Sequence, residues 1–307
     1  MSIVAAVTDT TRVDTIVRQR ERWMREAVTN FAKGRAEDGL RAFEQRGCLH
    51  FATSDNATVK FLVDAWEKSQ TRSSARSALL IAKTNAQIRA LNDEVRDRLK
   101  QSGQITGREI SVNTVTPSGH GQTLQFAAGD RVRFLLRNDA LKVINGTTAT
   151  ITHIETDDAL DPTIRVSIDG RLAAFRLSEL ADEHGRVRLG HAYSSTIYGA
   201  QGLTTDQCFV WADPAMTRHD AYVAFSRARD HVQIVADTRQ IDAQVRLDLP
   251  LSERRTAMIT PEARLTWLAT RLSRVHVKSC TLDPTLELAA RSPVRDRSRD
   301  HSRSYAR

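Results

Sequence analysis

Residues 77–99 read SALLIAKTNAQIRALNDEVRDRL, and this stretch decides the fold class. It opens with a compact apolar run at residues 78–82, of the kind found in the central strands of parallel sheets. Thr84 and Asn85 follow the run and can cap a helix, in which apolar side chains recur every three or four residues. A buried strand that leads directly into a capped amphipathic helix predicts an α/β fold with a parallel sheet.

The same alternation continues on both sides of this unit. Upstream, the apolar spacing predicts a helix from Arg18 that Gly34 interrupts, a second helix that ends near Gly47, a strand at 48–52, a helix around 59–66 and a polar loop at 72–76. Downstream, it predicts strands at 191–195, 207–212 and 232–236, a loop at 196–202, and helices at 218–227 and 261–275.

The residues between these two parts have a different period. After Gly103 the apolar spacing changes from about 3.6 to about 2 residues. Six short strand candidates follow, at residues 109–115, 122–126, 131–136, 147–154, 164–168 and 172–177. Turn signals such as Asn145-Gly146 and Asp169-Gly170 separate them. A β-rich block between two α/β parts predicts a small β-barrel inserted into one parallel-sheet domain.

The charge of the chain favours a polyanionic partner. Of its 307 residues, 45 are Lys or Arg and 37 are Asp or Glu, so the formal net charge is +8. Arginine supplies most of the cations, and its guanidinium suits phosphate geometry. Residues 291–307 hold six arginines and two aspartates, so half of the excess lies in a tail whose composition predicts disorder.

The sequence also indicates a cytoplasmic protein with reduced thiols. No apolar run approaches the roughly 18 residues of a membrane-spanning helix, and the N-terminus lacks the pattern of a secretion signal. Cys48, Cys208 and Cys280 lie far apart, so they form neither a disulfide framework nor a metal knuckle. We therefore expect no metal site and no membrane partner.

Three short stretches could carry chemistry, and each has a plainer alternative. Arg18-Gln19 stands at the start of a helix, where a solvated arginine is the simpler interpretation. Residues 196–202, TIYGAQG, suit a loop that brings backbone N–H groups close to phosphate, or a tight structural turn. Residues 222–229, YVAFSRAR, end in paired arginines that could reach a phosphate or only stabilise a helix C-terminus.

The order of these stretches resembles a known family. HAYSSTIYGAQGLTTD at residues 191–206, followed by AYVAFSRARD at 221–230, is similar to motifs V and VI of superfamily-1 DNA helicases of the RecD type. The similarity is greatest to the C-terminal helicase part of conjugative relaxases of the TraA and TrwC/TraI kind. Residues 16–34, IVRQRERWMREAVTNFAKG, resemble their motif IV region, and residues 77–99 resemble the block that follows it. Residues 126–154 resemble the SH3-like barrel inserted into their second RecA-like domain.

The resemblance implies a role for each matching position. Two arginines, Arg18 and Arg227, would face the γ-phosphate of ATP held by a first RecA-like domain. Positions near the nucleotide would be Gln19, Gln201, Gly202 and Arg229, and positions close to single-stranded DNA would be Thr84, Asn85 and Thr196. The barrel would help to form the wall of the DNA channel.

The resemblance also implies a division of the chain. We expect the second RecA-like domain over residues 1–103 and 189–248, the SH3-like barrel over 104–188, a helical extension over 249–280 and a disordered basic tail over 281–307.

The chain departs from the family pattern in two places. Tyr198-Gly199 stands where many relatives have His-Lys, which removes a cation. No GxxxxGKS or GxxxxGKT motif occurs, and the nearest approach, NGTT at residues 145–148, lacks the lysine. We therefore expect ATP and Mg²⁺ to bind only within a complete helicase. The N-terminal RecA-like and relaxase segments would then be a missing part of this chain or a second chain.

Three hypotheses for function stay open. The first is the C-terminal part of an ATP-dependent conjugative helicase that is inactive alone. The second is a non-catalytic DNA-binding module, which would bind single strands weakly and with a steep dependence on salt. The third is a degenerate remnant of the helicase, although the intact strand and helix patterns favour a foldable product.

Overall fold

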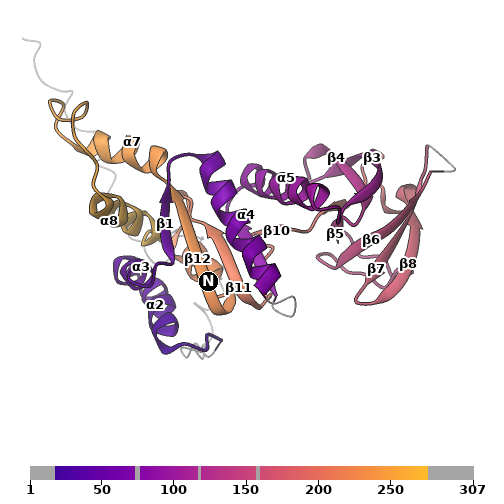
Figure 1. Ribbon diagram of the computed structural model, residues 1–307, viewed down its shortest axis with the longest axis horizontal. Helices are drawn as coiled ribbons and strands as arrows, with labels where there is room; N and C mark the ends of the chain where they lie inside the picture. The colour runs from indigo at the N-terminus through magenta and orange to yellow at the C-terminus, as the bar shows by residue number, and fades with distance from the viewer. Residues whose placement is uncertain (1–17, 73–76, 117–118, 157–159, 276–307) are drawn as a thin grey trace, which may run out of the picture. The chain divides into compact units, whose positions relative to one another are not determined.

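The computed structural model describes residues 18–72, 77–116, 119–156 and 160–275. Within them the chain forms a five-stranded parallel sheet flanked by helices, and a smaller antiparallel β unit inserted between strands of that sheet (Figure 1). The predicted fold class, an α/β domain with a parallel sheet and a β insertion, is confirmed. The predicted basic tail lies outside the described residues.

The parallel sheet combines strands from both parts of the chain. In spatial order its strands are β1 (Leu49–Ala52), β12 (Ala228–Asp237), β11 (Thr205–Trp211), β2 (Ala78–Ala82) and β10 (Ser194–Thr196). Every neighbouring pair is parallel. Strands β10 and β11, which precede and follow the predicted phosphate loop, therefore lie on either side of β2.

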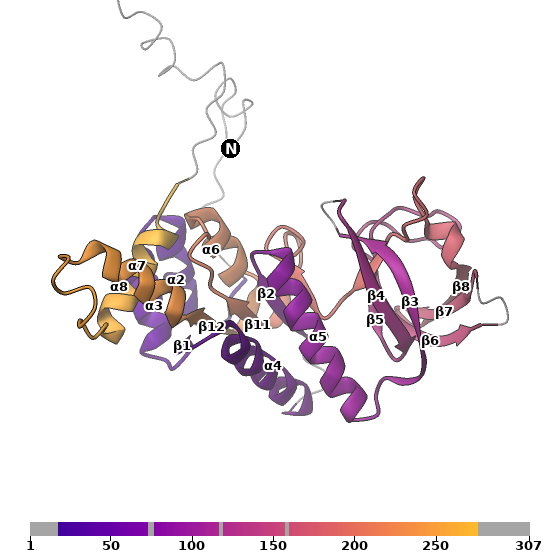
Figure 2. The same ribbon diagram turned by 90° about the horizontal axis from the view of Figure 1, so that it is seen from above.

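Helices pack against both faces of the parallel sheet. In β2, Leu79 and Ile81 belong to one hydrophobic cluster, whereas Leu80 and Ala82 belong to another, because successive residues of a strand point to opposite faces. The first cluster includes side chains of α2 (Arg22–Ala32), α3 (Ala36–Glu44), α6 (Arg218–Phe225), α7 (Thr238–Asp248) and α8 (Pro261–Leu272). The second includes those of α4 (Asp55–Arg72) and α5 (Asn85–Gln101), which lie on the other side in Figure 2.

The inserted β unit has its own sheets and its own core. Its strands are β3 (Thr106–Val115), β4 (Gly121–Ala128), β5 (Arg131–Phe134), β6 (Thr148–Glu155), β7 (Thr163–Ile168), β8 (Arg171–Arg176) and β9 (Leu189–His191), with a 3₁₀ helix, η1 (Leu177–Leu180), before β9. β3 pairs with β4, and the order in the second sheet is β8-β7-β6-β5-β9, with antiparallel pairing throughout. Phe126, Phe134 and Phe175 are buried in its core. The six strands predicted for this region are confirmed.

Two local predictions were wrong, and one helix was missed. The strand expected at residues 191–195 is two strands, because the chain leaves β9 in the insertion and joins β2 of the parallel sheet only at Ser194. The helix expected from Arg18 begins at Arg22, so Arg18 and Gln19 precede it. Helix α7 was not predicted, since only Ile241 among its apolar side chains is fully buried and Leu247 is exposed.

A buried carboxylate connects the insertion to the α/β part. Asp130 has no exposed surface and accepts hydrogen bonds from Nε of Arg96 at 2.9 Å and from the Tyr193 hydroxyl at 2.8 Å. Arg96 belongs to α5, and Tyr193 lies between β9 and β10. The Tyr193 oxygen also accepts a hydrogen bond from the N–H of Arg131, at the start of β5. One network therefore holds three segments where the two parts meet.

The described cysteines are not paired, and the potential metal ligands among the described residues do not cluster. Cys48 and Cys208 are free and buried, and burial raises the pKa of both, that of Cys208 to about 12. Cys280 lies outside the described residues. Within the described ranges, no three His, Cys, Asp or Glu side chains could hold a metal ion together. None of the helices described there has the length and apolar character needed to cross a membrane.

Candidate functional site

The structure divides the predicted site residues into two groups at opposite edges of the sheet. Arg227 immediately precedes β12, and the turn with Gln201 and Gly202 leads into β11, so these residues lie at the amino ends of parallel strands. Asn85 follows β2 and Thr196 ends β10, so both lie at the carboxyl ends. The connection from β10 to β11 therefore runs from one edge of the sheet to the other.

Arg227 is a buried cation held by oxygen atoms that carry no formal charge. Its side chain donates from Nε to the Val223 carbonyl at 2.9 Å, from Nη1 to the Leu203 carbonyl at 3.2 Å and from Nη2 to Oγ of Ser226 at 3.2 Å. The residue is only 7% exposed. Burial lowers the pKa of Arg227, and the neighbouring Arg18 lowers it further, although an arginine remains protonated in proteins.

Arg18 places a second guanidinium beside the first. Its Nη1 donates to the Ser226 carbonyl at 2.8 Å, next to Arg227 in the chain. Neither Arg18 nor Arg227 has a carboxylate within ion-pair distance in the part of the chain that the structure describes. Two unneutralised guanidinium groups at one edge attract an anion, and phosphate oxygens match their donor geometry.

Gln19 is buried and hydrogen-bonded to the backbone, whereas the family resemblance implies a contact with the nucleotide. It is 1% exposed, and its Nε2 donates to the carbonyls of Ser226 and Ala228, each at 3.0 Å. The N–H of Arg20 donates to the Arg229 carbonyl at 2.8 Å. These bonds hold the segment before α2 against the start of β12. The amide of Gln19 is thus buried, with its Oε1 unpaired within the described residues, and the expected nucleotide contact stays a prediction.

The side chain of Arg229 also has a partner within the protein. Arg229 lies in β12, and its Nη1 is 3.6 Å from Oδ1 of Asp206. The guanidinium is about half exposed. Arg229 thus pairs with a carboxylate of the protein itself, and its expected contact with the nucleotide stays a prediction.

The turn from Tyr198 to Leu203 connects the two edges. The N–H of Gln201 donates to the Tyr198 carbonyl at 3.0 Å, and the N–H of Leu203 donates to the Ala200 carbonyl at 3.1 Å. Gly202 has a φ of +90°, which only glycine adopts without strain, and it is exposed together with Gln201. The next carbonyl, that of Leu203, accepts the hydrogen bond from Arg227. The backbone of the predicted loop therefore does reach the arginine pair.

The second group of residues lines a pocket of about 330 Å³ at the carboxyl edge. Asn85 and Thr196, both expected near DNA, lie on its wall. Oγ1 of Thr196 accepts a hydrogen bond from the N–H of Gly199 at 3.0 Å. Thr84 is not among the lining residues. Its hydroxyl accepts a hydrogen bond from the N–H of Gln87 and caps α5. The capping role predicted for Thr84 is confirmed, and the DNA contact expected of this exposed residue stays a prediction.

Two further residues on this pocket, Arg133 and Tyr198, were not among the predicted site residues. Arg133 of β5 donates from Nη1 to Oγ of Ser195 at 3.1 Å, while its Nε is buried without a partner in the described structure. Tyr198 lies on the pocket with 65% of its surface exposed. Nothing in the sequence distinguishes Arg133 from Arg131, two residues earlier in the same strand. Only the folded insertion brings Arg133 beside the loop at residues 196–202.

Lys83 lies against the face of the Tyr198 ring and pairs with a carboxylate of α6. Its Nζ is 2.7 Å from Oδ2 of Asp220 in α6 and 5.4 Å from the centre of the Tyr198 ring. Burial opposes ionisation of Asp220, but the hydrogen bonds from Lys83 and Thr217 outweigh it and lower the pKa of this carboxyl. A charged pair thus connects the end of β2 to the start of α6.

Comparison with known proteins supports the family resemblance at a coarse level. No family model matches the chain. The conjugal transfer protein TraA of Rhizobium radiobacter is 27% identical over 248 residues, which cover 81% of this chain and 21% of that protein. TraA of Agrobacterium fabrum (strain C58 / ATCC 33970) is 29% identical over 222 residues, 72% of this chain and 19% of that protein.

Solved helicase structures give a partial match. The Pif1 helicase of Bacteroides with ADP-AlF3 and single-stranded DNA is 20% identical, with a TM-score of 0.48 over 72% of this chain and 50% of that one. The Pif1 helicase of Candida albicans is 17% identical, with a TM-score of 0.48 over 72% of this chain and 55% of that one. The chain spans about a fifth of the length of the curated relatives that it matches. It is similar to conjugal transfer proteins of the TraA kind, whereas the RecD type stays a prediction.

Proposed function

We propose that this chain is the second RecA-like part of a superfamily-1 DNA helicase that acts in conjugative transfer. In this proposal Arg18 and Arg227 contact the γ-phosphate of an ATP molecule that a different segment binds. The observation that carries the proposal is the pair of guanidinium groups at one sheet edge, with no carboxylate beside them in the described structure. The similarity to TraA proteins supports the biological setting.

The proposal assigns a chemical task to the arginine pair. During phosphoryl transfer, negative charge develops on the γ-phosphate oxygens and on the leaving oxygen. A positioned guanidinium stabilises this charge more in the transition state than in the ground state, so it accelerates hydrolysis. The sequence has no phosphate-binding GxxxxGKS or GxxxxGKT motif. ATP, Mg²⁺ and the P-loop would therefore come with the complete motor.

The loop between β10 and β11 gives the proposal a route from nucleotide to DNA. Its Leu203 carbonyl contacts Arg227, and Thr196 at its other end lies on the pocket at the carboxyl edge. A shift of Arg227 on phosphate release would therefore move the loop, and with it the residues that line the proposed DNA-binding pocket.

A hybrid protein tests the proposal. In it this chain replaces the matching region of TraA from Rhizobium radiobacter, and steady-state ATP hydrolysis is measured with single-stranded DNA. We expect DNA-stimulated hydrolysis that Arg227→Ala lowers by about 10³-fold or more, as for other arginine fingers. The matched control is Arg254→Ala, since Arg254 also donates to two carbonyls, those of Leu249 and Leu247, at the end of α7. Equal rates for the two variants would contradict the proposal. Absence of hydrolysis by the hybrid, when unaltered TraA is active in the same assay, would also contradict it.

The chain alone gives a second expected outcome. Without a P-loop segment it should hydrolyse no ATP, with or without single-stranded DNA, because no lysine and no Mg²⁺-holding carboxylate orient the phosphates. The measurement is steady-state phosphate release compared with the Arg227→Ala chain. Turnover clearly above that of the variant would show that this chain contains a complete site.

A further inference from the structure

We propose that the pocket at the carboxyl edge binds one nucleotide unit of a single strand, with Arg133 on its phosphodiester and Tyr198 stacked on its base. This inference rests on the proposed function and adds residues that the family motifs do not assign. It makes the inserted β unit a direct contributor of charge to the single-strand site.

Arg133 is a half-buried cation with unused hydrogen-bonding capacity. Its only hydrogen bond within the described residues goes to Oγ of Ser195, and its buried Nε has no partner there. Burial lowers the pKa of Arg133, and the nearby Arg131 lowers it further. A desolvated guanidinium without a carboxylate is costly, and an anionic group that enters the pocket would offset this cost.

Gly199 leaves the space that the Arg133 guanidinium uses. A Cβ atom at Gly199 would lie 2.8 Å from Oγ of Ser195 and 3.3 Å from Nη1 of Arg133. Any side chain at this position would therefore displace the hydroxyl or the guanidinium. The absence of a side chain at Gly199 therefore leaves room for Arg133 of the insertion beside the loop. This fit supports a defined position for the Arg133 guanidinium on the pocket.

Tyr198 supplies an exposed aromatic surface on the same pocket. It is 65% exposed, and Lys83 lies 5.4 Å from the centre of its ring. An aromatic ring that protein leaves uncovered on one side can stack on a nucleobase, and such stacking tolerates any base. Lys83 is itself paired with Asp220, so its ammonium group is held beside one face of the ring.

The remaining pocket wall suits a sugar or a base edge. The exposed Asn145 presents its amide there. Asn92 and Ser194 also line the pocket, but they are buried and hydrogen-bonded to each other. The one carboxylate on the wall, Asp93, lies 3.8 Å from Arg89, and burial raises its pKa. The volume of about 330 Å³ lies at the lower end of the range for small-molecule pockets, roughly 300–1,000 Å³.

Binding of a dye-labelled oligothymidine to the full chain tests this inference, measured by anisotropy over a series of salt concentrations. Arg133→Gln should weaken binding and reduce the slope of log K against log salt by about 0.7, the value for one phosphate contact on a single strand. Arg133→Lys should keep the slope, since it keeps the charge. Tyr198→Ala should weaken binding about tenfold without changing the slope, whereas Tyr198→Phe should bind like the parent chain.

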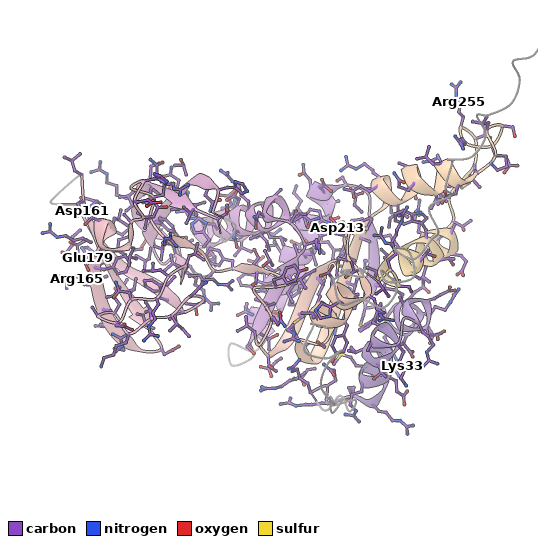
Figure 3. All side chains as sticks on the ribbon, turned by 180° about the vertical axis from the view of Figure 1, so that it is seen from behind. Lys33, Asp161, Arg165, Glu179, Asp213 and Arg255 are labelled. Atoms are coloured by element: carbon purple, nitrogen blue, oxygen red, sulfur yellow. The ribbon has the colours of Figure 1, made fainter. Side chains whose placement is uncertain are left out.

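Matched controls separate these effects from general changes in charge. Arg165→Gln removes the same charge from β7, where Arg165 pairs with Glu155 at the outer edge of the insertion (Figure 3), and its slope should equal that of the parent. Gly199→Ala should also weaken binding, because the added methyl group would lie 2.8 Å from Oγ of Ser195, the hydroxyl that holds the Arg133 guanidinium. On a strand with abasic sites throughout, the effect of Tyr198→Ala should disappear.

The outcomes distinguish this inference from the proposed function. Parent-like affinity and slope for both Arg133→Gln and Tyr198→Ala, in a chain that binds single strands, would overturn the inference and leave the proposed function intact. No binding of oligothymidine by the parent chain, at low salt, would overturn both. A loss of affinity in Arg133→Gln without any change of slope would show a structural role for Arg133 and would also overturn the inference.

Discussion

Two neighbouring residues, Arg18 and Gln19, have different tasks in this structure. Arg18 points a guanidinium toward Arg227, whereas Gln19 is buried and binds the backbone around β12. The sequence motif identifies both positions but not this division. The difference depends on which side chain faces Ser226 and Ala228, more than 200 residues away in the chain. Such a contact leaves no local pattern in the sequence.

Replacement of Gln19 tests its structural position. Gln19→Leu should lower the free energy of unfolding by about 1–3 kcal/mol, because it removes two buried hydrogen bonds to carbonyls. Urea denaturation of the full chain measures this, with the exposed Gln240→Leu in α7 as the control that should change little. A Gln19→Leu protein as stable as the parent would contradict the assignment.

At the scale of elements, the sequence predicted those whose apolar period is strong. The bounds of β2 and the start of α5 were predicted correctly because Ala78–Ala82 is uniformly apolar and Thr84 caps the helix. The two strands at residues 189–196 could not be separated, since a chain that leaves one sheet for another needs no turn residue. Helix α7 was missed because few of its side chains are buried.

The capping of α6 gives a test at this scale. Asp220 accepts the N–H of Thr217 at 2.9 Å and pairs with Lys83 at 2.7 Å, so Asp220→Asn should lower the free energy of unfolding by about 2 kcal/mol at neutral pH. Because the native pKa of Asp220 is lowered, its contribution is complete above the ordinary Asp value of about 3.9 and is lost as pH falls through the native pKa.

The pH dependence is measured as the difference in urea stability between the parent and Asp220→Asn. This difference should be largest near neutral pH and shrink below about pH 4. The control is Asp38→Asn, an exposed aspartate in the first turn of α3, whose effect should be small at every pH. A difference that stays constant down to acid pH would exclude the ion pair as its cause.

For the molecule as a whole, the buried network of Asp130 fixes the insertion to the sheet. The sequence predicted the insertion but not this joint, because Arg96, Asp130 and Tyr193 come from three distant segments. The joint also determines where Arg133 meets the loop at Ser195. The pocket at the carboxyl edge is therefore a property of the assembled chain and of no single motif.

Removal of one hydroxyl tests the joint. Tyr193→Phe should lower the free energy of unfolding by about 1–3 kcal/mol, because it leaves the N–H of Arg131 without its partner and removes a donor from Asp130. Tyr222→Phe is the matched control, since that hydroxyl makes no hydrogen bond within the described residues. Equal stability of the two variants would show that the network contributes nothing measurable.

The most direct test of the central claim is a double-mutant cycle on Arg18 and Arg227 in the TraA hybrid, with DNA-stimulated ATP hydrolysis as the measurement. If both guanidinium groups act on one phosphate, each single alanine substitution should lower the rate by about 10³-fold, and the double variant should lie within about tenfold of the slower single one. Independent losses that multiply in the double variant, or a single variant that hydrolyses ATP as fast as the parent hybrid, would contradict the claim.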